Sequence, residues 1–370
     1  MKSAAHRAAV AAVVASAMAV ATTVPGTARA LQLANSPWPM YGQNPQLNHR
    51  SPYLGPNNGS HLPPIEVPAG VLSDLSVTAD GLMVIAAGFS HIGIRMDGTL
   101  MWNAFISSTP RLSTPVIAQD GTFYVGNRAN DVRKHHVSNG QFFCKYRVAN
   151  IDGDVRGSVV ISERYPDRVY FGESGVAGGF FAVRMDPSGE GQTECQEIWR
   201  RPIRLPKGQP KPPDFKTNLN FKKIKGSPAT PLQVDEVPGS GDRKVLIHHG
   251  PRMIYKLIDH GDDGEMVAFR DLKAGGLGPS PIADPATGNI YLGTKKRLVF
   301  GLRSDDLSDL WPPVRVDGPI QSTAALSPNG DTVYVLTRRG GIYGIDTQTG
   351  QIRPGWPQYV DPGGFFFRSQ

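Results

Sequence analysis

The stretch STAALSPNGDTVYVLTRRGGIYGIDTQTGQIRPGW, residues 322–356, carries the pattern that decides the fold. After a small-residue opening it contains two short apolar runs, TVYVLT (332–337) and GIYGID (341–346), and it ends in a tryptophan. Short runs rich in aromatic and β-branched residues, separated by Asn-Gly and Gly-Gly turns, are typical of antiparallel hairpins. The opening and the final tryptophan add a first and a last strand. The stretch therefore predicts a four-stranded antiparallel unit.

Similar units follow one another along the chain from about residue 70. Their openings are centred on Ser76, Ser113, Ser158, Ser227, Ser280 and Ser322. The intervals between these serines are 37, 45, 69, 53 and 42 residues, and several of them fit one propeller blade. Outer-strand tryptophans recur at Trp102, Trp199, Trp311 and Trp356, and Cys144 takes the matching place in the second unit. One such sheet cannot bury both of its faces, so the units are expected to pack around an axis in a closed ring.

The unit resembles the pyrroloquinoline-quinone-like (PQQ-like) repeat of secreted bacterial propellers. The shared features are the small-residue opening, the V-Y-V second strand, the D-x-x-T-G turn (346–350) and the outer tryptophan. The segment WPMYGQNPQLNHRSPYLGP (38–56) is similar to the lead-in of such proteins. The resemblance implies an all-β propeller of six or seven four-stranded blades over residues 31–370. It also implies that the lead-in completes the last blade, with Trp38 and Tyr41 beside the strand around Tyr343.

The first thirty residues have the features of a secretory signal peptide. A basic start is followed by an Ala/Val-rich run from Ala8 to about Val24, and Ala28-Arg29-Ala30 provides small residues for cleavage near Ala30-Leu31. The alternative, a membrane anchor, would need a longer apolar run. There is no cysteine near the cleavage site, so a lipid anchor is not expected. No later stretch is apolar enough to span a bilayer. We expect a soluble mature protein in the periplasm or the extracellular medium.

Positive charge is concentrated in one segment. The formal net charge is +7, and residues 200–225 hold nine basic residues and one acid. Pro206, Pro210, Pro212 and Pro213 oppose a helix or a central strand, which predicts a long basic loop inserted into the propeller. We expect an anionic partner to bind the loop through Lys207, Lys211, Lys216, Lys222 and Lys223. The alternative is a solvated spacer.

A second set of cations suggests a site at the mouth of the central channel. Arg111, Arg156 and Lys225 each stand two residues before one of the opening serines. If the openings are equivalent, these side chains face the same mouth and attract an anion or an acidic loop. The alternative is three independent solvated side chains.

The chain has two cysteines, Cys144 and Cys195. They are expected on outer strands of neighbouring blades, and in an oxidising compartment they could form a disulfide. Such a bond requires Cα atoms within about 7 Å. The alternative is two free thiols. Because there is no Cys-x-x-Cys, a redox or zinc site has no support.

Acidic and histidine-rich segments are candidates for metal binding. The segment DHGDDGE (259–265) offers oxygen ligands for calcium, but its position in the repeat favours a turn. The pairs His135-His136 and His248-His249 lie on predicted strands, where neighbours point to opposite faces and cannot easily share one metal. We therefore interpret the histidines as exposed or hydrogen-bonded side chains and expect no metal site.

These observations favour a non-enzymatic extracytoplasmic propeller. We expect a monomer that acts as a binding or scaffold module for a protein or an anionic envelope polymer, without nucleic acid, cofactor or catalytic residues. The alternative is an enzyme, either a polysaccharide-cleaving propeller or a quinoprotein-type dehydrogenase. The resemblance implies that such a dehydrogenase holds its quinone with calcium, a catalytic aspartate and often two adjacent half-cystines. Here Cys144 and Cys195 are 51 positions apart.

Overall fold

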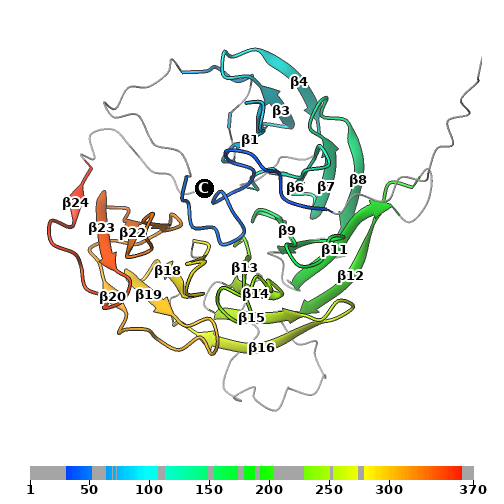
Figure 1. The fold of residues 1–370 in the computed structure, drawn as a ribbon. Coiled ribbons are helices and arrows are strands. Elements are labelled where there is room, and N and C mark those ends of the chain that lie inside the picture. The colour runs from blue at the N-terminus through cyan, green and yellow to red at the C-terminus, as the bar shows by residue number, and fades with distance from the viewer. Residues whose placement is uncertain are drawn as a thin grey trace, which may run out of the picture.

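The protein is a ring of β-sheets. The computed structural model describes residues 31–51, 64–68, 70–71, 73–106, 113–148, 154–173, 179–187, 192–202, 229–250, 253–273 and 279–360. Within these ranges the chain forms six four-stranded antiparallel sheets, arranged around an axis as blades (Figure 1). The predicted all-β propeller is confirmed. The predicted signal peptide and the five lysines of the basic segment lie outside the described residues and stay predictions.

Each blade is built from four consecutive strands. Blade 1 contains β1 (Ser76–Val77), β2 (Met83–Ala87), β3 (Ser90–Ile94) and β4 (Leu100–Phe105). Blade 2 contains β5 (Val116–Ile117), β6 (Thr122–Gly126), β7 (Asp131–His136) and β8 (Phe142–Arg147). Blade 3 contains β9 (Val160–Ile161), β10 (Val169–Gly172), β11 (Gly179–Pro187) and β12 (Cys195–Pro202).

The second half of the ring follows the same order. Blade 4 contains β13 (Leu232–Val234), β14 (Val245–His249), β15 (Met253–Asp259) and β16 (Gly264–Asp271). Blade 5 contains β17 (Ile282–Ala283), β18 (Ile290–Gly293), β19 (Leu298–Leu302) and β20 (Val314–Arg315). Blade 6 contains β21 (Ala325–Leu326), β22 (Thr332–Leu336), β23 (Gly341–Asp346) and β24 (Gln358–Tyr359). The residues directly after Trp356 thus provide the fourth strand of blade 6.

The second strand of a blade is apolar on both faces because both faces are covered. In β10, Phe171 stacks on Phe181 at 5.1 Å between ring centroids and reaches Tyr146 of blade 2. The neighbouring residue Tyr170 points the other way and packs with Trp199 in a cluster that includes side chains of blade 4. Side chains alternate across a strand, so successive apolar residues face two different neighbouring blades. This arrangement explains the almost continuous apolar sequence of the second strands.

The structure corrects the register of the repeat. Consecutive blades are connected through a hydroxyl-bearing residue, which stands two positions before the first paired residue of the inner strand. The backbone N–H of Thr114 donates to Ser158 Oγ, that of Ser158 to Thr230 Oγ1, and that of Thr230 to Ser280 Oγ, each at 2.9 Å. This anchor position is occupied around the ring by Asp74, Thr114, Ser158, Thr230, Ser280 and Thr323. The openings predicted at Ser76, Ser113, Ser227 and Ser322 are therefore displaced by one to three residues.

Outer-strand tryptophans join each of three blades to the next one. Trp102 covers Gly140 of blade 2, Trp199 covers Gly264 of blade 4, and Trp311 covers Gly350 of blade 6. A Cβ atom at any of these glycines would lie within about 2.6 Å of the indole, so no larger residue fits there. The tryptophan of one repeat and the turn glycine of the following repeat thus form a single packing unit.

The remaining consecutive blades are joined by other means. Cys144 of β8 and Cys195 of β12 form a disulfide with Cα atoms 5.9 Å apart, which confirms the predicted bond between the outer strands of blades 2 and 3. Between blades 4 and 5, Arg270 pairs with Asp309 at 2.6 Å.

Among the described residues no helix has the length and hydrophobicity needed to span a bilayer.

The expectation that the lead-in completes the last blade is wrong. Residues 31–51, called the lead-in here, lie inside the ring of blades, where Figure 1 shows them in blue. Their backbone forms hydrogen bonds with all six blades. The partners are Val77, Ile117, Pro166, Gln233, Ala283 and Leu326, one from each blade in order. Inner strands expose backbone N–H and C=O groups toward the axis of the ring. A single irregular segment can form hydrogen bonds with these groups in every blade only if it lies near the axis.

Candidate functional site

A mostly apolar pocket of about 690 Å³ lies against blade 1, on the face that is turned away from blade 2. We call the boundary between blade 6 and blade 1 the seam. The pocket is lined by Trp38, Gly42, His49, Ile65, Val67, Val71, Ser73, Asp74, Leu75, Met83, Ile85 and Ile94. Apolar pockets with a few polar groups are the usual form of a binding site. This pocket is therefore the candidate site.

The alternation of β2 and β3 explains why this face is apolar. Val84 packs with Trp102 and Phe123 at the contact with blade 2. Its neighbours Met83 and Ile85 point to the opposite face and contribute to a separate cluster with Ile92 and Ile94. In the other blades such a face packs against the preceding blade. In blade 1 it forms a wall of the pocket.

The lead-in provides the aromatic side of the pocket. The ring of His49 contacts Tyr41 and Trp38 edge to face, with ring centroids 5.1 Å and 6.4 Å apart. The hydroxyl of Tyr41 lies 2.5 Å from Thr323 Oγ1 of blade 6, so this group touches both sides of the seam. Burial lowers the pKa of His49 to about 4 and raises that of Tyr41 to about 12, which keeps both groups neutral at pH 7.

Asp74 is the acidic group of the pocket. It stands at the anchor position of blade 1, where the other five blades carry serine or threonine. The side chain reaches solvent, but its surroundings desolvate it enough to raise the pKa of the carboxyl above its usual value. Within the described part of the chain, Asp74 has no ion-pair partner. A carboxylate without a cation beside apolar walls can hold an apolar ligand that carries a positive charge.

The backbone of the lead-in is held in an unusual conformation beside the pocket. Gln43, Leu47 and His49 have φ between 53° and 73°, a region that residues other than glycine adopt rarely. A Cβ atom at Gly42, which also has positive φ, would lie 2.6 Å from the Cα atom of Leu47. Such conformations persist only where surrounding contacts impose them, and they are concentrated at functional sites.

The three cations predicted at a channel mouth do not occupy equivalent positions. In the corrected register, Arg111 precedes its anchor by three residues, Arg156 by two and Lys225 by five. The corrected register therefore does not support equivalent positions for the three residues, and their binding role stays a prediction. Arg156 forms an ion pair with Asp154 at 2.7 Å, and Arg111 and Lys225 lie outside the described residues.

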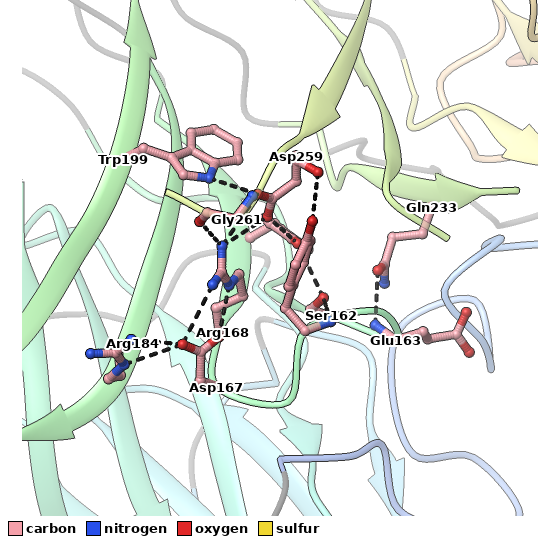
Figure 2. A network of polar contacts seen from close by, with 11 residues as sticks. Ser162, Glu163, Asp167, Arg168, Arg184, Trp199, Gln233, Asp259 and Gly261 are labelled. Atoms are coloured by element: carbon pink, nitrogen blue, oxygen red, sulfur yellow. Dashed lines mark hydrogen bonds and ion pairs between the residues drawn. The ribbon is translucent and has the colours of Figure 1, made fainter. Parts of the chain in front are cut away.

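The acidic segment at 259–265 joins blades 3 and 4. The carboxylate of Asp259 is buried and accepts hydrogen bonds from Trp199 and Arg168, as Figure 2 shows. It also accepts one from the hydroxyl of Tyr170, at 2.6 Å. It also accepts the backbone N–H of Gly261, at 2.8 Å, in the turn. Its oxygens are thus used by protein donors, which supports the interpretation of this segment as a turn. In the ranges that the structure describes, no three His, Cys, Asp or Glu residues are grouped as metal ligands.

The adjacent histidines belong to the packing between blades. His135 contacts His91 of blade 1 at 5.0 Å between ring centroids and stacks on Phe123. His248 lies beside Phe180 of blade 3, and burial lowers the pKa of His248 to about 3. The interpretation of these histidines as exposed or hydrogen-bonded is wrong for His248, which is buried and whose two ring nitrogens have no hydrogen-bond partner among the described residues. Neutral imidazoles serve here as aromatic packing groups.

The sequence interpretation missed the pocket. One signal was available: with the correct register, Asp74 is the only acidic residue among the six anchors. The contacts of Tyr41 and His49 had no such signal, because they depend on the path of the lead-in through the ring.

Comparison with known proteins supports the fold alone. No protein-family model and no curated protein matches the chain. Among solved structures, BamB from Moraxella catarrhalis is similar with 13% identity and a TM-score of 0.57, over 79% of this chain and 77% of that one. Quinohemoprotein alcohol dehydrogenase from Comamonas testosteroni is similar with 12% identity and a TM-score of 0.51, over 85% and 72%. A europium-containing methanol dehydrogenase gives 11% and 0.53, over 87% and 85%.

These structural neighbours are PQQ-type propellers. The protein has the PQQ-type propeller fold. At such identities the likeness does not extend to activity, and the neighbours include both BamB and dehydrogenases. The function of this PQQ-type propeller must be argued from its own pocket and surface.

Proposed function

We propose that this propeller is a non-enzymatic extracytoplasmic binding or scaffold module, and that a protein partner binds at the seam. One observation carries the proposal: exposed apolar side chains are concentrated on the two blades that border the seam. Of fourteen large exposed apolar residues in the described ranges, seven belong to blade 1 and three to blade 6. These ten are Val71, Leu75, Phe89, Met96, Leu100, Met101, Phe105, Ile352, Tyr359 and Val360. Concentrated apolar surface marks sites of protein interaction.

The pocket gives this surface a centre. Protein interfaces have an apolar core with aromatic anchors and a polar rim. Around the pocket, Ile65, Met83 and Ile94 supply apolar walls, while Asp74 supplies a charge. An envelope polysaccharide would instead require many hydrogen-bonding groups. The apolar character of the site therefore favours a protein segment.

The residues present do not fit the quinone group of the dehydrogenases. The resemblance implies two adjacent half-cystines, whereas Cys144 and Cys195 join the outer strands of two blades. The backbone of the lead-in is bonded to all six blades, in five of them through a residue of the inner strand. We therefore propose a function without a quinone cofactor. The disulfide also supports a location outside the reducing cytoplasm, because such bonds persist mainly in oxidising compartments.

The basic segment remains part of the proposal as a second contact. Binding of an anionic partner by the five lysines between Lys207 and Lys223 would add a salt-dependent attraction to the apolar contact at the seam. Salt dependence would distinguish the two contributions, since apolar contacts do not weaken as salt rises.

Site-specific photocrosslinking in intact cells tests the proposal. Phe105→p-benzoylphenylalanine places the probe on blade 1, and Val237→p-benzoylphenylalanine is the control on blade 4; the native side chains are 78% and 64% exposed. We expect one discrete protein adduct from position 105 and none from position 237. The adduct should disappear in the Val71→Asp background and persist in the Val267→Asp background. Equal adducts at both positions, or none at position 105, would contradict binding at the seam.

A further inference from the structure

The contact that joins other blades through tryptophan and glycine is incomplete at the seam. Trp356 covers Gly344 of its own blade, as Trp102 and Trp311 cover Gly93 and Gly301 of theirs. The turn glycine of blade 1 that would receive it is Gly98. Of the residues that the structure describes, only Ile65 would lie within 4 Å of a Cβ atom at Gly98, at 3.8 Å. The seam therefore has the tryptophan and the glycine of the contact, but it does not bring them together.

The described chain ends beside this boundary. Strand β24 is the outer strand of blade 6, and the N–H of Val360 donates to the carbonyl of Gly340 at 2.9 Å. Ten residues follow, DPGGFFFRSQ (361–370). An extended chain spans about 3.3–3.6 Å per residue, so residues 365–368 can reach roughly 17–29 Å from Val360. Tyr41 contacts both Thr323 of blade 6 and the pocket residue His49, so the pocket borders the blade that this segment leaves.

The composition of this segment complements the pocket. Three consecutive phenylalanines are followed directly by Arg368. Phenylalanine is a residue of protein interiors. The pocket offers apolar walls beside Asp74, a carboxylate without an ion-pair partner among the described residues. Two adjoining glycines, Gly363 and Gly364, allow the chain to change direction before the phenylalanines.

We infer that the C-terminal segment 365–368 is an intramolecular ligand of the seam pocket, with its phenylalanines against the apolar walls and Arg368 paired with Asp74. The inference rests on the proposed function in using the same site. It adds that the segment occupies the site until a partner with a similar apolar and basic sequence displaces it.

Binding of the free peptide in trans tests the inference with purified protein. The ligand is a fluorescently labelled peptide of residues 361–370, and binding is measured by fluorescence anisotropy. The protein truncated after Val360 should bind it at least tenfold more tightly than the full chain, because the tethered segment competes at high effective concentration. Peptide with the three phenylalanines changed to serine should bind the truncated protein at least tenfold more weakly.

Variants of the pocket locate the peptide. In the truncated protein, Val71→Asp should weaken binding at least fivefold, and Val237→Asp on blade 4 should leave it unchanged. Asp74→Asn should weaken binding at low salt and remove most of its salt dependence. Near-ultraviolet circular dichroism identifies any variant that has lost its fold. If Val71→Asp does not fold, Asp74→Asn, which is the less disruptive change, still tests the site.

Three results would overturn the inference. They are equal binding of peptide by the truncated and full-length proteins, no binding to the truncated protein, and binding unaffected by Val71→Asp. A concentration-dependent dimer that is lost on truncation would assign the segment to a second copy instead. This assay uses only purified protein and peptide, so its failure would not affect the test of the proposed function, the adduct at position 105. Absence of that adduct would likewise leave the peptide-binding result unaffected.

Discussion

The contact between blades 3 and 4 and the seam between blades 6 and 1 use the same kind of residue with different results. At the first boundary, Trp199 covers Gly264 and donates to Asp259 at 3.1 Å, so packing and hydrogen bonding coincide (Figure 2). At the seam, Trp356 contacts Tyr334 of its own blade at 5.4 Å between ring centroids, and it does not cover a glycine of blade 1. A repeat motif therefore specifies a contact only when the following repeat is in place to receive it.

The difference separates stability from function in this ring. Buried contacts between blades account for the rigidity of the scaffold, since their loss would leave cavities and unsatisfied polar groups. At the seam, the surface that another propeller blade would cover is open to a ligand. Binding surfaces are drawn from regions with fewer stabilising contacts, and the seam has this character.

The largest effect is expected from removing the tryptophan at each boundary. Trp199→Ala should lower the free energy of unfolding by about 3–5 kcal/mol, because the side chain is buried and Asp259 loses a donor. Trp356→Ala should cost about 1 kcal/mol or less, since this indole is only partly buried. Urea unfolding of both variants measures the contrast. Equal losses would show that the seam is packed as tightly as the other boundary.

A pH effect is expected next from the buried histidine at the boundary between blades 3 and 4. The pKa of His248 is about 3 in the folded protein and about 6.5 when unfolded, so the unfolded state alone takes up a proton between these values. Stability should therefore fall as pH decreases from about 6.5 to about 3, by up to roughly 4 kcal/mol for this group. His248→Leu should reduce this loss.

A buried aromatic residue that does not titrate provides the control. Phe171→Leu should leave the change in stability between the two pH values as large as in the wild type. Denaturant unfolding at pH 7 and pH 4 gives the measurement. If His248→Leu and the wild type lost the same stability between these pH values, the buried imidazole would not be the cause.

A smaller effect is expected from the boundary between blades 2 and 3, where the disulfide replaces the tryptophan contact. Cys144→Ser combined with Cys195→Ser should lower the free energy of unfolding by about 2–4 kcal/mol. Reducing agent should destabilise the wild type by a similar amount and leave the double variant unaffected. A reductant effect on the double variant would mean that another process is being measured.

The second strands show how far local sequence predicts this fold. The V-Y-V pattern of residues 333–335 requires only that both faces of a strand be covered, and the run predicted at 332–337 forms β22, Thr332–Leu336. The anchors show where prediction fails. Ser113 and Thr114 are neighbours with the same chemistry, and only their partners, Gly126 N–H within the blade and Ser158 across the boundary, distinguish them.

The sequence by itself determined the four-stranded unit and its repetition. It left two alternatives for Cys144 and Cys195, a disulfide or two free thiols. The unit and its repetition depend on period-2 alternation, turn residues and spacing, which are local properties. Only the tertiary structure decided the path of the lead-in, the unmatched tryptophan at the seam and the pocket around Asp74. Each of these depends on contacts between residues far apart in the chain, as between Tyr41 and Thr323, and local periodicity holds no information about them.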